Sequence, residues 1–316
     1  FTGIAALGSI MIPELQKEGY SRGFATSLVT CSSILGTLIP PSIPMLTMAV
    51  ALQESVGRQF IAGVVPGILT SVAMSIYVYF AAKKLKIPSM PKMGWRQRLH
   101  VLKDSIWALL FPVIILGSIY SGLATSTEAA VISAIYVIII EMLVYKELTW
   151  KKLYEQLGPS IVNAATMSVL MATAQTMLWY LTSAHVPEMM LDAVTHAITS
   201  STTLMFILCG IFLIAGCFMN VGSVVIILAP ILLPLFASYG IDATQFIIMA
   251  TMMNQIGFIT PPFGLNLFVA MKVGNAGMKE VFMGSWQLLI CMAVVTVLII
   301  LVPQISTILP QERQTM

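Results

Sequence analysis

Two short stretches of this chain combine residue types that can hold ions inside apolar surroundings. The later one, GFITPPFGLNLF (residues 257–268), lies between long apolar segments and carries two prolines and two glycines. Two successive prolines end a helix, because proline lacks an N–H group and its ring clashes with the preceding turn. The carbonyl groups of Gly257, Phe258 and Ile259 are then released to coordinate a cation. N–H groups from Phe263 onward can face an anion at a helix N-terminus.

Further polar groups accompany both breaks. In the later stretch, Thr260 adds a hydroxyl and Gly264 lets the backbone approach a ligand closely. Around the earlier Pro40–Pro41 pair, the same reasoning selects Gly36, Thr37, Leu38, Ile39 and Ser42. A single break of this kind is more often a simple proline kink, whereas two matched copies favour a site.

A turn at 216–223 (GCFMNVGS) is the expected companion of the later break. Asn220 and Ser223 supply oxygen atoms, while Gly222 permits the helix to unwind. Asn220 can instead make a hydrogen bond between helices with no ligand. Asn254, inside the broken segment, has the same two interpretations.

The elements that carry these residues belong to a membrane protein. Of the 316 residues, 58% are hydrophobic and only 9% are charged, and the mean hydropathy is +0.93. A soluble domain of this length could not bury that much apolar surface, and apolar runs of about 20 residues recur, as bilayer-spanning helices require. The four cysteines lie in apolar runs without metal-binding spacing, so we interpret them as buried free thiols. The expected class is an all-α polytopic membrane protein, in contact with the lipid bilayer and not with nucleic acid.

The apolar pattern predicts an order of elements along the chain. We expect the end of a hydrophobic hairpin, a broken span, a short arm, a span, a polar loop, three further spans, a surface helix, a second hairpin, a second broken span, a second arm and a last span. These lie, in that order, at 4–13, 23–51, 52–58, 60–82, 83–102, 103–121, 127–145, 159–181, 187–199, 201–237, 245–271, 272–281 and 283–302.

Positive charges orient this layout, because short cytoplasmic loops are enriched in lysine and arginine. The segment 83–103 holds seven of these residues and is assigned to the cytoplasm. Counting spans outward from it places 14 of the 16 lysines and arginines inside and leaves Arg58 and Arg313 outside. The count works only if 1–13 and 201–237 are re-entrant hairpins that return to their own side.

A shift of 221 residues overlays the N-terminal part of the chain on the C-terminal part without a gap. Ten of the 54 pairs from 10 to 63 are identical, and six of the ten are glycine or proline, which fix backbone shape. The loops 14–22 and 235–243 fall on opposite sides in the predicted orientation, so the repeats are inverted, as in many secondary transporters.

We therefore divide the chain into five parts. They are a first repeat, scaffold spans with a cytoplasmic loop, a span with an interfacial helix, a second repeat, and a last span with its tail, at 1–63, 64–158, 159–200, 201–284 and 285–316.

Other conspicuous residues have simpler interpretations. Thr125 and Glu128 form the pattern of a helix-capping box at the external membrane edge, with proton carriage as the alternative role of Glu128. No lysine or arginine falls in the middle of a predicted span. The charge of an anionic substrate must then be met by helix N-termini and bound cations, which points to cation symport.

An enzyme is not expected. The sequence contains neither HExxH nor GxSxG, and no histidine falls in the core of a predicted span. An intramembrane hydrolase or acyltransferase would need such a group of residues. A purely structural membrane subunit would not need two matched helix breaks.

Five ordered motifs resemble a known family: ALGSIMIPELQKEGYSRGFA (6–25), LGTLIPPSIPM (35–45), TSTEAAVISAIY (125–136), APILLPLFASYGID (229–242) and IGFITPPFGLNLFVA (256–270). They are similar to the large membrane subunit of tripartite ATP-independent periplasmic (TRAP) transporters, over essentially the whole chain. The resemblance implies a Na⁺-coupled importer of organic acids, such as C4-dicarboxylates or sialic acid, in the bacterial inner membrane. It also implies a periplasmic substrate-binding protein, a small membrane subunit that is separate or fused, and an elevator-type motion of the hairpin-bearing domain.

The family's ion and substrate region maps to the two proline breaks and the second hairpin turn. The Na⁺ candidates are Gly36, Thr37, Ile39, Pro40, Asn220, Gly222, Gly257, Phe258 and Thr260. The substrate candidates are Ser42, Ser223, Asn254, Pro262 and Gly264. Family members are longer at the N-terminus and carry a hairpin tip there, so we expect that this chain either is truncated or lacks its first hairpin tip. The alternative function is a binding-protein-independent Na⁺/dicarboxylate or anion symporter of similar inverted-repeat fold.

Overall fold

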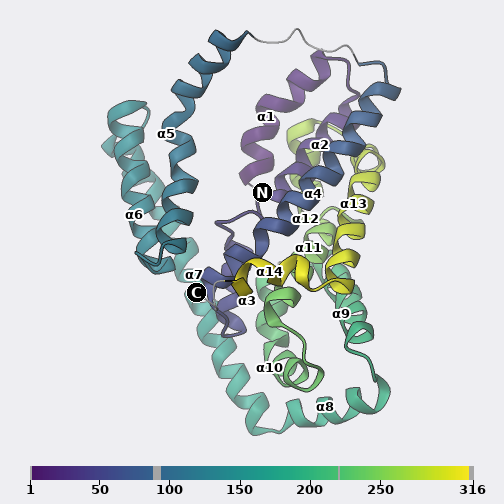
Figure 1. The fold of residues 1–316 in the computed structure, drawn as a ribbon. Helices are drawn as coiled ribbons and strands as arrows, with labels where there is room; N and C mark the ends of the chain where they lie inside the picture. The colour runs from purple at the N-terminus through teal and green to yellow at the C-terminus, as the bar shows by residue number, and fades with distance from the viewer. Residues whose placement is uncertain (1, 88–93, 220, 313–316) are drawn as a thin grey trace. The chain divides into compact units, whose positions relative to one another are not determined.

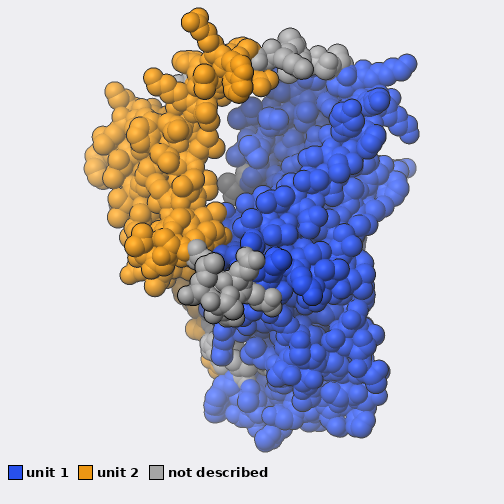
Figure 2. All heavy atoms as spheres, in the orientation of Figure 1, with its two compact units in different colours: residues 1–88, 177–316 blue, residues 89–176 orange. Residues whose placement is uncertain are grey.

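The chain folds into helices joined by short connections (Figure 1). The computed structural model describes residues 2–87, 94–219 and 221–312, and no strand occurs in these ranges. Two compact units are present: unit 1 comprises residues 1–88 and 177–316, and unit 2 comprises residues 89–176 (Figure 2).

Unit 1 carries the helices that contain both proline breaks. Its helices are α1 (Thr2–Lys17), α2 (Arg22–Leu35), α3 (Ile43–Ala51), α4 (Val56–Lys84), α8 (Val186–Ala197), α9 (Ser201–Gly216), α10 (Val221–Tyr239), α11 (Ala243–Gly257), α12 (Leu265–Gly274), α13 (Met278–Leu301) and α14 (Gln304–Glu312). Unit 2 contains α5 (Trp95–Tyr120), α6 (Ser126–Ile139), the π-helix η1 (Ile140–Val144) and most of α7 (Trp150–Ser183), which continues into unit 1.

Several helices are long and apolar enough to cross a bilayer. Within the described ranges, α4, α13 and the continuous segment α6–η1 meet both criteria, and bent pairs within α5 and at α8–α9 raise the number from three to five if each pair is one span. Large apolar side chains on these helices are exposed, such as Ile76 on α4 and Val131 on α6. Apolar exposure along helices of this length requires lipid as the solvent. The predicted class of all-α polytopic membrane protein is confirmed.

α11 is enclosed by the other helices of unit 1. Its residues from Thr244 to Gly257 are all buried, because α3, α4, α9, α10 and α13 pack around it. The ring of Phe246 lies 5.4 Å from that of Phe212 on α9 and 4.7 Å from that of Phe236 on α10, centroid to centroid. A helix that is buried on every side is held in place by such packing. The later proline break therefore follows a helix with fixed surroundings.

α2 and α13 cross so closely that only glycine fits at the contact. A Cβ atom on Gly284 would lie 2.5 Å from Ser27 Oγ and 2.9 Å from Gly23 O. Ser27 Oγ also donates to Val281 O at 2.6 Å, which links α2 to α13 directly. Lipid supplies no hydrophobic force between helices, so close backbone approach and such hydrogen bonds hold membrane helices together.

The two halves of unit 1 have corresponding helix boundaries. Adding 221 to the bounds of α2, 22–35, gives 243–256, and α11 spans 243–257. In the same way α3 corresponds to α12, and α4 corresponds to α13. The later helix of each pair begins one residue after the position that the shift of 221 predicts. Gly19 and Gly240, also 221 apart, both have positive φ, 99° and 62°, which glycine adopts without strain. The packing corresponds as well, because α1 contacts α12 and α10 contacts α3.

The predicted capping box begins α6 in unit 2. Thr125 Oγ1 accepts from Glu128 N at 3.3 Å, and Glu128 Oε2 accepts from Thr125 N at 2.7 Å. The prediction is therefore confirmed. Tyr136 OH donates to Trp107 O at 2.7 Å and ties α6 to α5.

Three element boundaries differ from the predicted ones. α5 begins at Trp95, inside the predicted polar loop 83–102, because lysine and arginine are good helix formers and a charged sequence does not exclude a helix. α7 begins at Trp150 and continues through Pro159, where we expected a span to start; membrane helices tolerate such a proline. α14 was not predicted, because its nine residues are too few for a span-length apolar run.

Replacing Gly284 by valine should lower the free energy of unfolding by about 1–3 kcal/mol, the usual effect of overpacking. The added side chain would force α13 away from Ser27 and Gly23. Thermal unfolding in detergent would measure the change. Gly210→Val on α9 is a matched control, since nothing lies within 4 Å of a Cβ atom there. Equal unfolding temperatures for the two variants would contradict the close crossing.

Candidate functional site

The later break begins where α11 loses its continuing hydrogen bonds. Phe258 N–H still donates to Asn254 O, and Thr260 N–H donates to Gly257 O at 2.9 Å. The next two residues, Pro261 and Pro262, have no N–H group to offer, so the ladder stops there. The Pro261–Pro262 and Pro40–Pro41 peptide bonds are both cis.

Beyond the prolines the chain folds back on the end of α11. The N–H groups of Asn266 and Leu267 donate to Phe258 O at 3.0 and 3.3 Å. This close return needs glycine, because a Cβ atom on Gly264 would lie 2.9 Å from Phe258 O and 3.0 Å from Thr260 O. The predicted carbonyl ligand Phe258 therefore points towards the start of α12, where we expected the anion-facing N–H groups.

The hairpin α9–α10 meets the end of α11. Gly216, the last residue of α9, faces Gly257, and a Cβ atom on Gly257 would lie 2.8 Å from Gly216 Cα. Next to this contact, Asn254 Nδ2 donates to Met219 O at 3.3 Å. The structure thus brings together the later break, Asn254 and the predicted hairpin turn. Asn220 lies outside the described residues.

Two amide oxygens beside the break are buried without a hydrogen-bond partner among the described residues. They are Asn254 Oδ1, on a side chain with no exposed surface, and Asn266 Oδ1, on a residue that is 6% exposed. Both residues adjoin Phe258, since Phe258 N bonds to Asn254 O and Phe258 O accepts from Asn266 N. An unpaired buried acceptor costs about 1–3 kcal/mol, and a bound cation would remove that cost. The later break therefore has the chemistry of a cation site made of neutral oxygens.

Asn266 was not among the predicted site residues. Its signal was present in the sequence, because it is the polar residue in GFITPPFGLNLF that follows the break within the first turn of the new helix. We considered the N–H groups of that turn and not its side chains. The first turn of a helix can present side chains as well as N–H groups to a ligand.

The earlier break is closed by a serine. Ser42 Oγ donates to Thr37 O at 2.6 Å and accepts from Met45 N at 3.3 Å, so it spans the break and caps α3. Thr37 Oγ1 donates to Ile34 O at 2.7 Å. A Cβ atom on Gly63 of α4 would lie 2.5 Å from Leu38 O, which shows how closely α4 approaches this break.

The two breaks offer different groups to a ligand. At the positions 221 before Asn254 and Asn266 stand Ser33 and Met45, and Ser33 Oγ donates to Val29 O at 2.8 Å. The earlier break thus has hydroxyl and carbonyl oxygens where the later one has amide oxygens. No group of three or more histidine, cysteine, aspartate or glutamate residues that could hold a metal occurs in the described part of the chain.

The remaining predicted residues differ in exposure. Pro40, Gly222, Phe258 and Gly264 are buried, Thr37, Ser223 and Thr260 are half-buried, and Gly36, Ile39 and Pro262 are exposed. The assignments of individual residues to Na⁺ or to substrate stay predictions.

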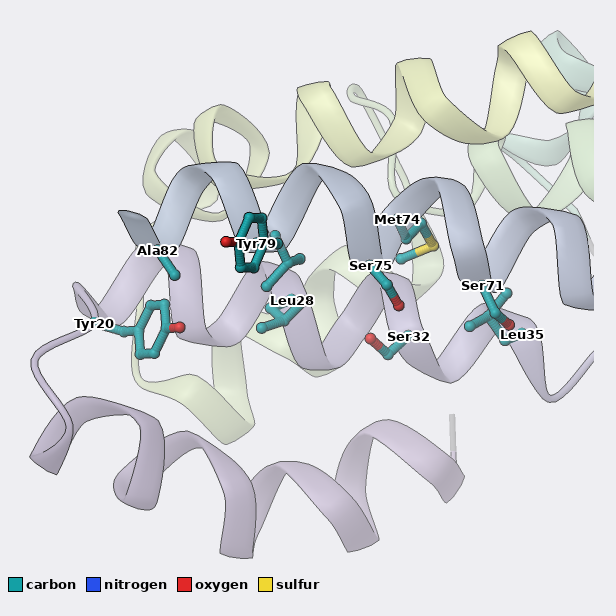
Figure 3. Close-up of a pocket in the computed structure, with 10 residues that line it drawn as sticks. Tyr20, Leu28, Ser32, Leu35, Ser71, Met74, Ser75, Tyr79 and Ala82 are labelled. Carbon is teal, nitrogen blue, oxygen red and sulfur yellow. The ribbon is translucent and has the colours of Figure 1, made fainter. Parts of the chain in front are cut away.

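A separate pocket of about 430 Å³ lies between α2 and α4 (Figure 3). Tyr20, Leu28, Ser32 and Leu35 line one side of it, and the other side is formed by residues of α4 from Ser71 to Ala82. None of the predicted Na⁺ or substrate residues lines this pocket. It is therefore distinct from the candidate site.

Comparison with known proteins gives one consistent result. Residues 2–305 match the family model described as "Tripartite ATP-independent periplasmic transporter, DctM component". A C4-dicarboxylate TRAP transporter large permease protein of Pseudomonas aeruginosa is 35% identical over 307 residues, which cover 97% of this chain and 72% of that protein. A sialic acid TRAP transporter large permease protein of Vibrio cholerae is 31% identical, with 96% and 71% covered. An isethionate TRAP transporter permease protein, DctMQ, of Oleidesulfovibrio alaskensis is 34% identical, with 96% and 48% covered.

Replacing Ser42 by alanine should lower the free energy of unfolding by about 1 kcal/mol or more, because it removes a helix cap and also leaves Thr37 O without its donor. Denaturant titration of the purified protein would measure this. Ser55→Ala is the matched control, since Ser55 caps α4 through Arg58 N without a second bond across a break. A loss at Ser42 no larger than that at Ser55 would show that the serine does not close the break.

Proposed function

The chain belongs to the family of DctM components of TRAP transporters, and from this premise we propose that it carries organic acids inward in symport with Na⁺. As a large permease subunit of this family it is a transporter component and not an enzyme. Such subunits work with a periplasmic binding protein and a small membrane subunit, which is sometimes fused, as in DctMQ. The bacterial inner membrane is the proposed location.

The observation that carries the Na⁺ proposal is the pair of unpartnered amide oxygens at the later break. Asn254 Oδ1 and Asn266 Oδ1 are buried acceptors beside the C-terminal end of α11. Unwound backbone and the C-terminal ends of half-helices coordinate Na⁺ in many secondary transporters. We assign Na⁺ to these two oxygens together with the carbonyl group of Gly257, because the Phe258 carbonyl already accepts two N–H groups. Asn254 thereby moves from the substrate group to the ion group.

The substrate proposal follows from charge. Because no lysine or arginine falls in the middle of a predicted span, an organic acid would meet the N-terminal ends of α3 and α12 and a bound Na⁺. The relatives are named for C4-dicarboxylate, sialic acid and isethionate, and for this chain we propose an organic acid of this kind.

The arrangement of the helices supports inverted repeats and an elevator mechanism. Helix boundaries in the two halves of unit 1 agree after a shift of 221 residues, and α1–α12 packing corresponds to α10–α3 packing. Both breaks lie in unit 1, and unit 2 forms a separate compact body. An elevator requires one body that holds the site and a second body that serves as a scaffold. We propose unit 1 and unit 2 for these roles.

Uptake should depend on both a Na⁺ gradient and the binding protein. The complete transporter, with its small subunit, would be placed in proteoliposomes and supplied with labelled organic acids and the cognate binding protein. Removing either the inward Na⁺ gradient or the binding protein should abolish uptake. Uptake that needs the gradient alone would favour a binding-protein-independent symporter, and uptake that needs neither would reject the proposal.

Replacing Asn254 or Asn266 by leucine should raise the Na⁺ concentration for half-maximal uptake by about tenfold, which corresponds to about 1.4 kcal/mol. Each change removes one proposed oxygen ligand. Thr296→Val is the control, because the Thr296 hydroxyl is already bonded to Met292 O at 2.9 Å on α13. An unchanged Na⁺ dependence in both asparagine variants would refute the assignment of the ion to this break.

A further inference from the structure

Four polar side-chain atoms at the first turns of α4 and α11 are buried without a hydrogen-bond partner among the described residues. They are Arg58 Nε, Gln59 Oε1 and Gln59 Nε2 on α4, and Thr244 Oγ1 on α11. Gln59 has no exposed surface, and Thr244 is 1% exposed. Buried polar groups in proteins are nearly always hydrogen-bonded to protein or to ordered water. This concentration of unpaired atoms therefore points to a common ligand.

An ion pair brings these atoms together. Arg58 Nη2 lies 2.8 Å from Asp242 Oδ2, and Asp242 Oδ1 caps α11 by accepting from Thr244 N at 2.8 Å. Gln59 follows Arg58 in the first turn of α4, and α4 contacts α11. The unpaired atoms therefore belong to one polar cluster. We call this cluster, made of Arg58, Gln59, Asp242 and Thr244, the α4–α11 junction.

The crossing of α2 with α13 corresponds to this junction, because the shift of 221 residues relates the four helices. The shift relates Gly23 to Thr244, and it relates Gln59 to Glu280 in the same way. A Cβ atom on Gly23 would lie 2.5 Å from Glu280 Cγ, so these two residues touch. We therefore expect Gln59 and Thr244 to face each other as well. A threonine in place of glycine keeps α4 and α11 further apart, and their facing polar atoms do not bond to each other directly.

The chemistry of the junction selects the ligand. Arg58 Nε and Gln59 Nε2 can only donate, Gln59 Oε1 can only accept, and the Thr244 hydroxyl can do both. A metal cation would be repelled by the guanidinium group and would find no ligand in the N–H groups. An anion would lie beside the Asp242 carboxylate and the amide oxygen. Water both donates and accepts, so it is the small molecule that suits all of these groups.

Water has a route to the junction from the protein surface. The side chains of Arg58 and Asp242 are 26% and 29% exposed, whereas the neighbouring Gln59 has no exposed surface. A partly buried ion pair is favourable only when its remaining protons and lone pairs are also hydrogen-bonded. Arg58 Nε has no such partner among the described residues. A water molecule at this atom would complete the hydrogen bonds of the ion pair.

We propose that the α4–α11 junction is a binding site for ordered water molecules, which bridge the Gln59 amide to the Thr244 hydroxyl and to Arg58 Nε. Buried waters of this kind make about three hydrogen bonds each and are part of the folded structure. They join the first half of unit 1 to the second, as the direct bond from Ser27 Oγ to Val281 O does at the α2–α13 crossing. The inference does not depend on the transported ion or substrate.

The junction lies next to the earlier break. Gln59 and Gly63 are four residues apart, so they share one face of α4 and are separated by about 6 Å along the helix. Gly63 is the residue at which a Cβ atom would lie 2.5 Å from Leu38 O. The water site thus holds α4 in place one turn from its contact with a carbonyl group of the earlier break.

Replacing Gln59 by methionine tests the water site through the sign of the effect. Methionine is an unbranched side chain of similar length without N–H or carbonyl groups. If water binds the amide, the variant loses satisfied hydrogen bonds, and its unfolding temperature in detergent should fall by about 2 °C or more. If no water binds, the change removes a buried unpaired amide. The unfolding temperature would then rise or stay the same, which would overturn the proposal.

Gln245→Met is the matched control. The Gln245 amide is also buried on α11, but its Nε2 atom donates directly to Ile299 O at 2.9 Å. The loss of this bond should lower the unfolding temperature, and Gln59→Met should change it in the same direction.

A high-resolution map of the complete wild-type transporter gives a second readout that needs no variant to fold. It should show water peaks about 3 Å from the Gln59 amide and from the Thr244 hydroxyl. A protein group bonded directly to the amide would overturn the proposal. A peak that contacts oxygen atoms alone would indicate a cation and would overturn the assignment to water.

Discussion

The structure depends on one constraint: backbone polar groups released by a broken helix must find partners where water is scarce. An unsatisfied N–H or carbonyl group in apolar surroundings costs several kcal/mol. At the later break the constraint is met by Phe258, whose carbonyl accepts two N–H groups from the start of α12. At the earlier break it is met by Ser42, whose hydroxyl reaches back to Thr37 O. Both breaks thus keep a defined shape, and at the later one two buried side-chain oxygens have no partner among the described residues.

Glycine makes the surrounding packing close enough to hold those breaks. Gly257 and Gly216 let α11 and the hairpin helix α9 touch through their backbones, and Gly284 does the same for α13 against α2. Side chains at Gly216 or Gly257 would separate α9 from α11 beside Asn254. The same residue type therefore ends the helix, permits the return of the chain and brings the hairpin to the site. Close backbone contact is needed here because lipid provides no hydrophobic force that would hold membrane helices together.

Much of this architecture could be predicted from the sequence, for identifiable reasons. Apolar length and the paired prolines placed α4, α13 and both breaks within a few residues, because these signals are local. The capping box at Thr125 was predicted for the same reason. Predictions failed where local composition misleads: Trp95 starts a helix in a charged segment, and α7 passes through Pro159. Asn266 had a signal in the sequence, its place in the first turn after the break, but only the fold shows that its Oδ1 atom lacks a partner among the described residues, because this depends on how α12 returns to α11.

The distribution of charged residues along the chain explains why the proposed mechanism needs Na⁺ beside the substrate. A carboxylate that leaves water without a partner loses several kcal/mol of solvation, and the predicted spans offer it no lysine or arginine in their interior. In the proposed mechanism Na⁺ supplies the missing positive charge, so the ion is a structural part of the substrate site and not only its energy source. A transporter built in this way cannot move the anion alone, because the unneutralised carboxylate would not enter.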